Sequence, residues 1–324
     1  MAAVDSFHLL YREMYREIAR SCDCYVETLA VVGALYTATK AIVFIRDCCC
    51  LLRHHFIPRL VHHRDLVQQY GQWAIVCGAL EPIAKAYAKE LAARGVCIIL
   101  LSPDMSSASD VSKSVSEAYG VEVIVVEADF SLGHAVSKSV TDIIKDKDIG
   151  FIINSLDVSL FSSQCFSGLC ESRLWDSVSR DLVGATLVTR LALPGMTARR
   201  RGAVVNISSG THWRPSPAGA TLSASTAYLD SFSWALHYEY GPQGIFVQSL
   251  LPCGVVCPGP EDPDRAEGGS WLVPHVQVYA RHALSTLGVT RRTTGYWPHT
   301  IQFGLVRSLP DWAWVLAWRV FSRT

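Results

Sequence analysis

The sequence has no net charge: its 324 residues carry 29 basic and 29 acidic side chains, and only 18% of the residues are charged. Nucleic acid binds strongly basic surfaces, so this balance argues against that class of partner, and we expect no nucleic-acid binding. The chain also lacks internal repeats and low-complexity tracts, which argues against a solenoid. Half of the residues are apolar, so the chain can bury one large core.

The cysteine spacings of a disulfide framework or a zinc site are missing too. The eleven cysteines are an odd number, and Cys77 and Cys97 lie inside apolar runs. Cys22 and Cys24 are separated by one residue, and the cysteines at 48–50 are consecutive. Because consecutive residues of a helix point in different directions, such cysteines do not close one tetrahedral site. We therefore expect reduced thiols and no metal site.

One apolar run is long. Residues 28–45 read TLAVVGALYTATKAIVFI, in which Lys40 is the one charged residue. Eighteen residues are just enough to cross a bilayer, although a lysine at mid-bilayer costs about 2.5–3.5 kcal/mol unless its amine reaches the interface. A basic flank follows, with arginines at 53, 59 and 64 and four histidines, as suits a segment that ends at lipid headgroups. We expect membrane association through residues 28–45, and a helix packed on the core is the alternative.

From residue 65 onward, apolar runs alternate with helical patterns. The runs suited to buried parallel strands are 73–78, 96–101, 121–126, 150–154, 202–207 and 245–251. The helical segments between them are 83–94, 111–119, 135–144, 174–196 and 223–240. This alternation predicts an α/β fold, a doubly wound parallel sheet of the Rossmann type, with an N-terminal apolar helix and a C-terminal helical extension.

The same patterns divide the chain into three parts. Residues 1–64 form a targeting or membrane-associating segment, and 65–256 form the Rossmann domain. Residues 257–324 begin with a turn-rich acidic loop and continue into helical, tryptophan-bearing sequence. We expect this last part to extend over a substrate groove.

The segment 202–230 resembles the catalytic segment of the short-chain dehydrogenases/reductases, with a strand, Ser209, a loop and a helix in that order. Shorter stretches, among them FIPRL at 56–60, LALPGM from 191 and TTGYW from 293, resemble the branch that contains the 17β-hydroxysteroid dehydrogenases of types 3 and 12. The resemblance covers nearly the whole chain.

In that family a serine precedes a catalytic tyrosine by thirteen residues, and a lysine follows the tyrosine by four. Here the same count from Ser209 reaches Leu222 and then Thr226. Tyrosine is the acid/base of hydride transfer, and the lysine lowers its pKa. Leu222 has no titratable proton, and Thr226 has no charge. Asp181 occupies the position at which the family has an asparagine in the preceding long helix. We therefore read Asp181, Ser209, Leu222 and Thr226 as degenerate positions that leave no working catalytic set.

The resemblance also locates the cofactor loop. The glycine pattern of the family, T-G-x-x-x-G-x-G, matches Cys77, Gly78, Pro82 and Ala84, so only its first glycine is present. Asp129 resembles the adenine-side aspartate, and Asn154 is the first residue of the N-N-A-G motif on the nicotinamide side. Gly78, Asp129 and Asn154 are thus the remaining candidates for cofactor binding. We expect no required cofactor and only weak residual binding of NADP(H).

These readings predict an inactive member of the family that acts by binding, either a protein partner, which the sequence does not name, or a hydrophobic small molecule. The alternative is an NADP(H)-dependent steroid or fatty-acyl oxidoreductase with a relocated proton donor. The resemblance further implies a homodimer formed through the helices 174–196 and 223–240.

Localisation rests mainly on the resemblance. The arginines at 12, 16 and 20 align on one helical face, as in a mitochondrial presequence, whereas the acidic residues among the first 24 are untypical of one. An inactive member of the same branch is associated with mitochondria, and the active relatives lie in the endoplasmic reticulum membrane. We predict a mitochondrial protein, with the endoplasmic reticulum membrane as the alternative.

Overall fold

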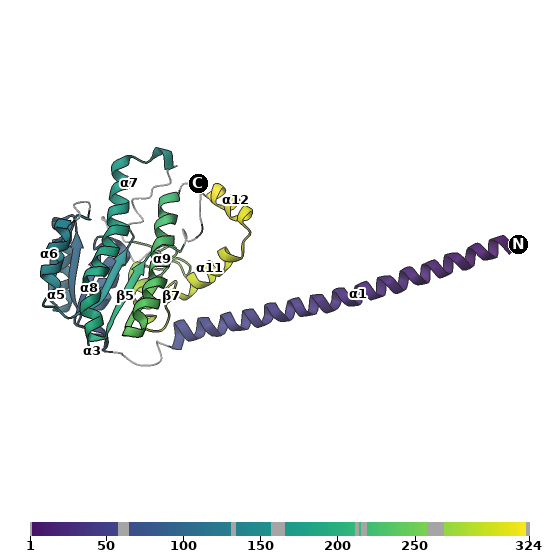
Figure 1. Ribbon diagram of the computed structural model, residues 1–324, viewed down its shortest axis with the longest axis horizontal. Helices are drawn as coiled ribbons and strands as arrows, with labels where there is room; N and C mark the ends of the chain where they lie inside the picture. Colours follow the sequence, from purple (N-terminus) through teal and green to yellow (C-terminus); the bar gives the residue numbers. More distant parts are fainter. Residues whose placement is uncertain are drawn as a thin grey trace. The chain divides into compact units, whose positions relative to one another are not determined.

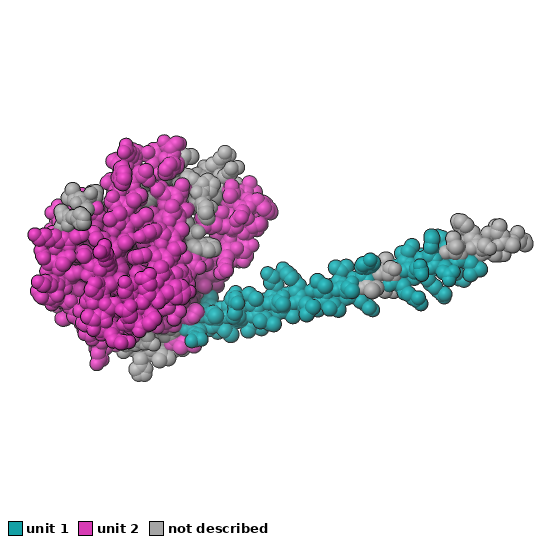
Figure 2. Space-filling model, viewed as in Figure 1, with its two compact units in different colours: residues 1–53 teal, residues 54–324 magenta. Residues whose placement is uncertain are grey.

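The chain forms two units, residues 1–53 and residues 54–324 (Figure 2). The computed structural model describes residues 2–57, 65–130, 134–156, 166–210, 214, 219–257 and 269–321. The first unit consists of one long helix, and the second contains the sheet and the helices that cover it (Figure 1).

Helix α1 runs over Ala2–Leu51, and the π-helical turn η1, Leu52–Phe56, follows it. Every side chain from Tyr25 to Cys50 is exposed, including Leu29, Leu35 and Phe44. A helix gains most of its stability in water from packing an apolar face, whereas the apolar side chains of α1 between residues 25 and 50 are exposed. By length and composition it is the one described helix that could cross a membrane.

Seven parallel strands form the centre of the second unit, in the order β3-β2-β1-β4-β5-β6-β7. Their bounds are β1 Trp73–Cys77, β2 Cys97–Ser102, β3 Val123–Glu127, β4 Ile149–Ser155, β5 Gly202–Ile207, β6 Ile245–Leu250 and β7 Arg292–Thr293. The order reverses between β1 and β4, and ligands of doubly wound sheets bind beyond the carboxyl ends of strands at such a switch point. The predicted doubly wound sheet is confirmed.

Helices cover both faces of this sheet (Figure 1). Their bounds are α3 Leu66–Tyr70, α4 Pro82–Ala92, α5 Met105–Tyr119, α6 His134–Ile144, η4 Phe166–Gly168, α7 Glu171–Val178, η5 Ser179–Gly184, α8 Ala185–Arg199, α9 Ala220–Tyr240, η6 Gly241–Gln243, α10 Val276–Ser285, α11 Trp297–Ser308 and α12 Asp311–Phe321. Alternate strand residues enter different core clusters, as Val76 and Ile75 of β1 do, because successive side chains of a strand point to opposite faces.

Two of the predicted helical ranges differ most from the structure. Helix α5 starts at Met105, earlier than the predicted 111, because the Asp104 carboxylate caps it and accepts hydrogen bonds from the backbone N–H groups of Ser106 and Ser107. The predicted helix 174–196 is divided into α7, the π-helical segment η5 and α8. Insertions of this kind often occur near functional sites, and η5 contains Asp181.

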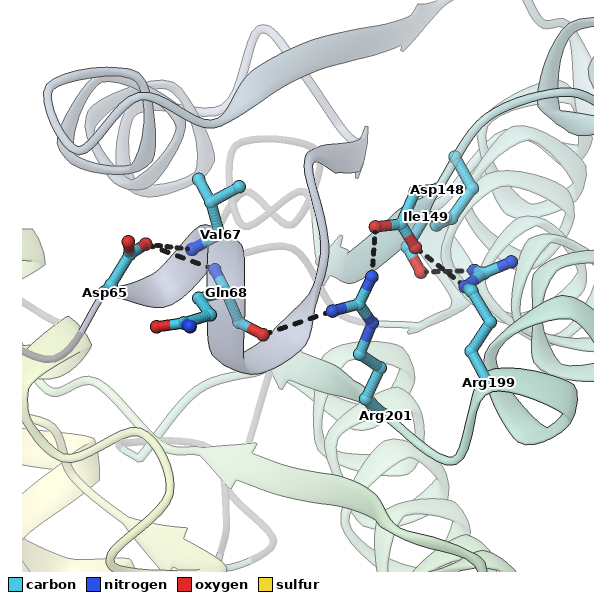
Figure 3. A network of polar contacts seen from close by, with 7 residues as sticks. All are labelled: Asp65, Val67, Gln68, Asp148, Ile149, Arg199 and Arg201. Atoms are coloured by element: carbon cyan, nitrogen blue, oxygen red, sulfur yellow. Dashed lines mark hydrogen bonds and ion pairs between the residues drawn. The ribbon is translucent and has the colours of Figure 1, made fainter.

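An ion-pair network lies at the amino end of the sheet (Figure 3). The Asp148 carboxylate lies 2.7 Å from Nε of Arg199 and 2.8 Å from Nη2 of Arg201. Arg199 also donates to the carbonyl oxygen of Ile149, at 3.0 Å, and Arg201 donates to that of Gln68, at 3.2 Å. The network joins α3, β4, α8 and the start of β5 at the end of the sheet opposite the strands' carboxyl ends, so its role is structural.

Candidate functional site

Leu222 lies in the first turns of α9 and is fully buried. It belongs to an apolar cluster with Leu156, Ala185 and Leu229, against which Phe232 packs. Leu156 follows β4, where its N–H donates to the carbonyl oxygen of Ile207 at 3.0 Å, and it stands in the motif that resembles the family's nicotinamide-side sequence. Two leucines therefore share one core cluster where the resemblance places the proton donor and the nicotinamide.

The other three degenerate positions are buried as well. Asp181 in η5 is 2% exposed, Ser209 after β5 is 5% exposed, and Thr226 in α9 is 0% exposed. The Thr226 hydroxyl has no hydrogen-bond partner among the described residues. All four positions therefore have little or no contact with solvent.

Asn154 is part of a buried polar network. Its amide Nδ2 donates to Asn206 Oδ1 at 2.8 Å and to Thr189 Oγ1 at 3.2 Å. Asn206 in turn donates from Nδ2 to Ser233 Oγ at 2.8 Å. The network joins β4, β5, α8 and α9, and Asn154 is only 1% exposed. Its amide protons are thus already used within the protein, and the prediction that Asn154 binds a cofactor stays a prediction.

Sequence reasoning did not identify the partners of Asn154. One signal was available, because Asn206 is the only polar residue of the apolar run 204–207, and a polar side chain in a buried strand requires a hydrogen-bond partner. Thr189 and Ser233 lie in helices, and their distance along the sequence from Asn206 does not predict that they belong to its hydrogen-bond network.

The phosphate-binding turn keeps its first glycine and little else. Gly78 has φ +76°, and a Cβ there would lie 2.9 Å from the Ser155 carbonyl oxygen, so only glycine fits. Pro82 occupies the start of α4 and has no N–H to donate, and Glu81 at the N-cap places a carboxylate where a phosphate would bind. The cavity at this turn measures about 30 Å³, roughly the volume of one water molecule. These residues do not fit a dinucleotide pyrophosphate.

A larger cavity, of about 240 Å³, lies beside this turn. Its lining includes Asp129 and is completed by Pro103, Ala128, Phe130, Asp176, Ser179 and Arg180. Arg180 lines both cavities, so it lies between them. The sequence did not reveal this cation, because Arg180 belongs to the π-helical segment η5, which apolar periodicity does not predict. An open cavity thus lies on the adenine side of the family's cofactor cleft, and Leu156 and Leu222 pack together on its nicotinamide side.

Asp104, next to Pro103, is engaged in capping α5. Besides the two backbone N–H groups, the Ser107 and Ser106 hydroxyls donate to its carboxylate at 2.6 and 2.7 Å. Hydrogen bonds from Ser107 and then Ser106 lower the pKa of Asp104 to about 2. Its Oδ1 atom accepts three of these bonds, which leaves it little capacity for a ribose hydroxyl.

A histidine of α11 contacts a cysteine in the loop after β6. His299 is fully buried, with Nε2 3.1 Å from the Gly254 carbonyl oxygen, while the Cys253 N–H points to Nδ1 at 3.4 Å. Burial lowers the pKa of His299 to about 4 and raises that of the Cys253 thiol to about 11. At neutral pH the imidazole is uncharged and the thiol is protonated, so this pair supplies neither a general acid nor a nucleophile.

A model of the short-chain dehydrogenase family matches residues 72–264, and the chain belongs to that family. It is 60% identical, over 99% of both chains, to the inactive hydroxysteroid dehydrogenase-like protein 1 of Danio rerio. The Homo sapiens protein of the same name is 48% identical over 100% of this chain and 97% of the relative. The very-long-chain 3-oxoacyl-CoA reductase of Bos taurus is 31% identical over 88% of this chain and 91% of its own. These relatives confirm the predicted family and branch.

Solved structures agree on the fold. A 7β-hydroxysteroid dehydrogenase superposes with a TM-score of 0.65 at 22% identity, over 76% of this chain and 95% of its own. A short-chain dehydrogenase from Sphingobium yanoikuyae, in complex with NADPH, gives a TM-score of 0.57 at 21% identity, over 74% and 96% of the two chains. At such identities the likeness extends to the fold alone.

Proposed function

We propose that the protein is a catalytically inactive member of its family that acts by binding. One observation carries the proposal: Leu222 and Leu156 belong to one buried apolar cluster at the position of the family's proton donor and nicotinamide. The relatives named inactive hydroxysteroid dehydrogenase-like protein 1 align over essentially the whole chain and support the same reading.

Hydride transfer to a carbonyl needs a proton for the developing alkoxide, and the site offers none at the required position. A relocated donor was the alternative, and Tyr228 is the nearest tyrosine along α9. Its hydroxyl lies 2.7 Å from the Thr186 hydroxyl, and its ring stacks on Phe232 toward the outside of the helix, with 38% of the residue exposed. Tyr228 therefore packs α9 against α8 rather than facing the site.

The proposal includes no required cofactor. Glu81 and Pro82 oppose the binding of a pyrophosphate, and the cavity at the turn is small. Arg180 and Asp129 line the neighbouring cavity, so any residual binding of NADP(H) would come from its adenosine end and be weak.

For partners, the proposal includes membrane attachment through residues 28–45 and a homodimer. The exposed positions of α9 include Ala224, Ala227, Tyr228, Ala235 and Tyr238, which are small or aromatic and suit contact with a second copy, and Glu239 is the charged residue among them. A protein partner or a hydrophobic ligand would complete the function. Residues 258–268 of the segment expected over the substrate groove lie outside the described residues.

A mitochondrial address, with the endoplasmic reticulum membrane as the alternative, is also part of the proposal. The exposed apolar side chains of α1 support a membrane-anchored protein in either case.

Turnover assays test the inactivity directly. The full chain in detergent is incubated with NADPH or NADH and with steroid ketones or 3-oxoacyl-CoA substrates. We expect no oxidation of the cofactor above the blank, and none in Leu222→Tyr/Thr226→Lys, because tyrosine is larger than the fully buried leucine that it replaces and a lysine at the fully buried position 226 must bury its charge. Turnover that Ser209→Ala abolishes would overturn the proposal. Turnover abolished by Tyr228→Phe would instead establish the relocated donor.

A further inference from the structure

The last two helices and the loop before α10 expose large apolar side chains on the second unit. We call this set the C-terminal apolar surface; its members are 40–72% exposed and are Trp271, Leu272, Ile301, Leu305, Leu309, Trp312 and Leu316. Ile301 and Leu305 are four residues apart on α11, as Trp312 and Leu316 are on α12, so each pair shares a helix face. Apolar surface of this extent on a soluble monomer usually marks an interaction site.

The exposure does not come from helices that fail to dock. On α12, Trp314 is 9% exposed, and on α11, His299 is fully buried, so each helix already packs one face on the core. Arg214 donates to the carbonyl oxygens of Val306 at 3.1 Å and Leu309 at 2.6 Å, and it forms an ion pair with Asp311. These contacts fix the turn between α11 and α12 while their outer faces stay apolar.

The loop before α10 is fixed to the same surface. Trp271 contacts Trp297 edge-on, with 5.2 Å between ring centroids. Gln302 donates from its amide to the Leu272 carbonyl oxygen at 2.8 Å. Trp271 and Leu272 therefore extend the apolar face of α11 rather than forming a separate patch.

The chain that follows α1 is bound to this region. Phe56 packs on Trp297 with 6.1 Å between ring centroids, and Nε2 of His55 lies 3.0 Å from Thr300 Oγ1. Leu51 ends α1, and Phe56 is five residues later, so the two are at most about 18 Å apart along the chain. Wherever the end of α1 meets a membrane surface, α11 must lie close to that surface.

The chemistry of the region suits the headgroup layer of a bilayer. Tryptophan is enriched at membrane interfaces, and basic residues bind anionic lipids. From Trp297 to Phe321 there are two arginines, Arg307 and Arg319, against one acid, Asp311, which is paired with Arg214. Further arginines at 53, 59 and 64 flank the point where the chain leaves α1.

We propose that the C-terminal apolar surface lies in the headgroup layer of the membrane to which α1 attaches, so that a phospholipid bilayer containing anionic lipid is its partner. The proposal rests on the membrane attachment proposed above. It adds a second contact, made by the folded unit itself, that would hold the former catalytic domain against the membrane.

Site-specific photocrosslinking tests the contact. The full chain is reconstituted in vesicles of phosphatidylcholine and phosphatidylserine, with p-benzoylphenylalanine placed at Leu305, at Trp312, at Ile301 or, as the control, at Tyr119 on α5, outside the proposed dimer helices. Ile301 and Tyr119 are both 41% exposed, so this pair is matched in general accessibility. We expect phospholipid adducts at Leu305, Trp312 and Ile301, and none above background at Tyr119.

Co-sedimentation of the same samples with the vesicles distinguishes a failure of the surface contact from a failure of membrane attachment. Protein that sediments with the vesicles but forms no lipid adduct at Leu305 or Trp312 overturns the surface contact and leaves attachment by α1 intact. Protein that does not sediment overturns both. Crosslinks from Leu305 or Trp312 to a second copy, without lipid adducts, overturn the lipid contact in favour of self-association.

Discussion

Leu222 does not merely remove the family's proton donor. Its side chain also packs with Leu156 from the neighbouring strand end. The count from Ser209 predicted which residue stands in the tyrosine position. It could not predict that the leucine at 156, which departs from the same family pattern, would share its cluster, since contact across that length of chain depends on the sheet topology. The pair shows that two positions that depart from the family pattern pack against each other, so the difference is larger than one lost functional group.

His299 gives a prediction at the same scale. Burial lowers its pKa to about 4, from 6.5 in the unfolded chain. The unfolded state therefore binds more protons between these values, so the contribution to stability is full above pH 6.5 and is lost as the pH falls toward 4. We expect a loss on the order of 3 kcal/mol in the free energy of unfolding, measured by denaturant titration at each pH.

The variant His299→Gln should flatten this dependence, because glutamine carries no titrating proton. His237→Gln is the matched control: burial also lowers the pKa of His237, but that residue is less buried than His299 and should affect the slope less. A slope that His299→Gln leaves unchanged would contradict the assignment.

Among the elements, the sequence predicted those with strong patterns and missed those that depend on neighbours. Six strands and the helices between them follow from apolar periodicity. The strand β7 contains only Arg292 and Thr293, and it exists because the edge of β6 offers partners. The π-helical segment η5 is likewise invisible to periodicity, and so the position of Arg180 at the cleft could not be foreseen.

The amino-end network offers a prediction at this scale. Asp148→Ala removes the carboxylate that two arginines share, and we expect the core to lose about 1–2 kcal/mol of stability in denaturant titration. The estimate is modest because all three side chains are 28–39% exposed. Asp47→Ala on α1 is the control, since its ion pair with Arg46 is 60–67% exposed and should leave the core unchanged. Equal effects of the two substitutions would contradict a role for the network in holding α3 and β4 together.

At the scale of the whole molecule, the fold of an oxidoreductase is kept while the two ends of its cofactor cleft differ. Leu156 packs with Leu222 at the nicotinamide end, whereas Asp129 and Arg180 line an open cavity at the adenosine end. An exposed apolar helix precedes this domain, and an exposed apolar surface covers its last helices. The site and the relatives describe a catalytically inactive member of the family, and the exposed apolar side chains support the membrane attachment proposed above.

Calorimetric titration of the full chain with NADPH and with 2′-phospho-ADP-ribose, which differs only by lacking the nicotinamide, tests the closure of the catalytic end most directly. We expect NADPH to bind no more tightly than the shorter nucleotide, because Leu156 and Leu222 pack together where the resemblance places the nicotinamide. Affinity for NADPH higher by a factor of about ten or more, roughly 1.4 kcal/mol, would mean that the nicotinamide is accommodated and that the site is not closed.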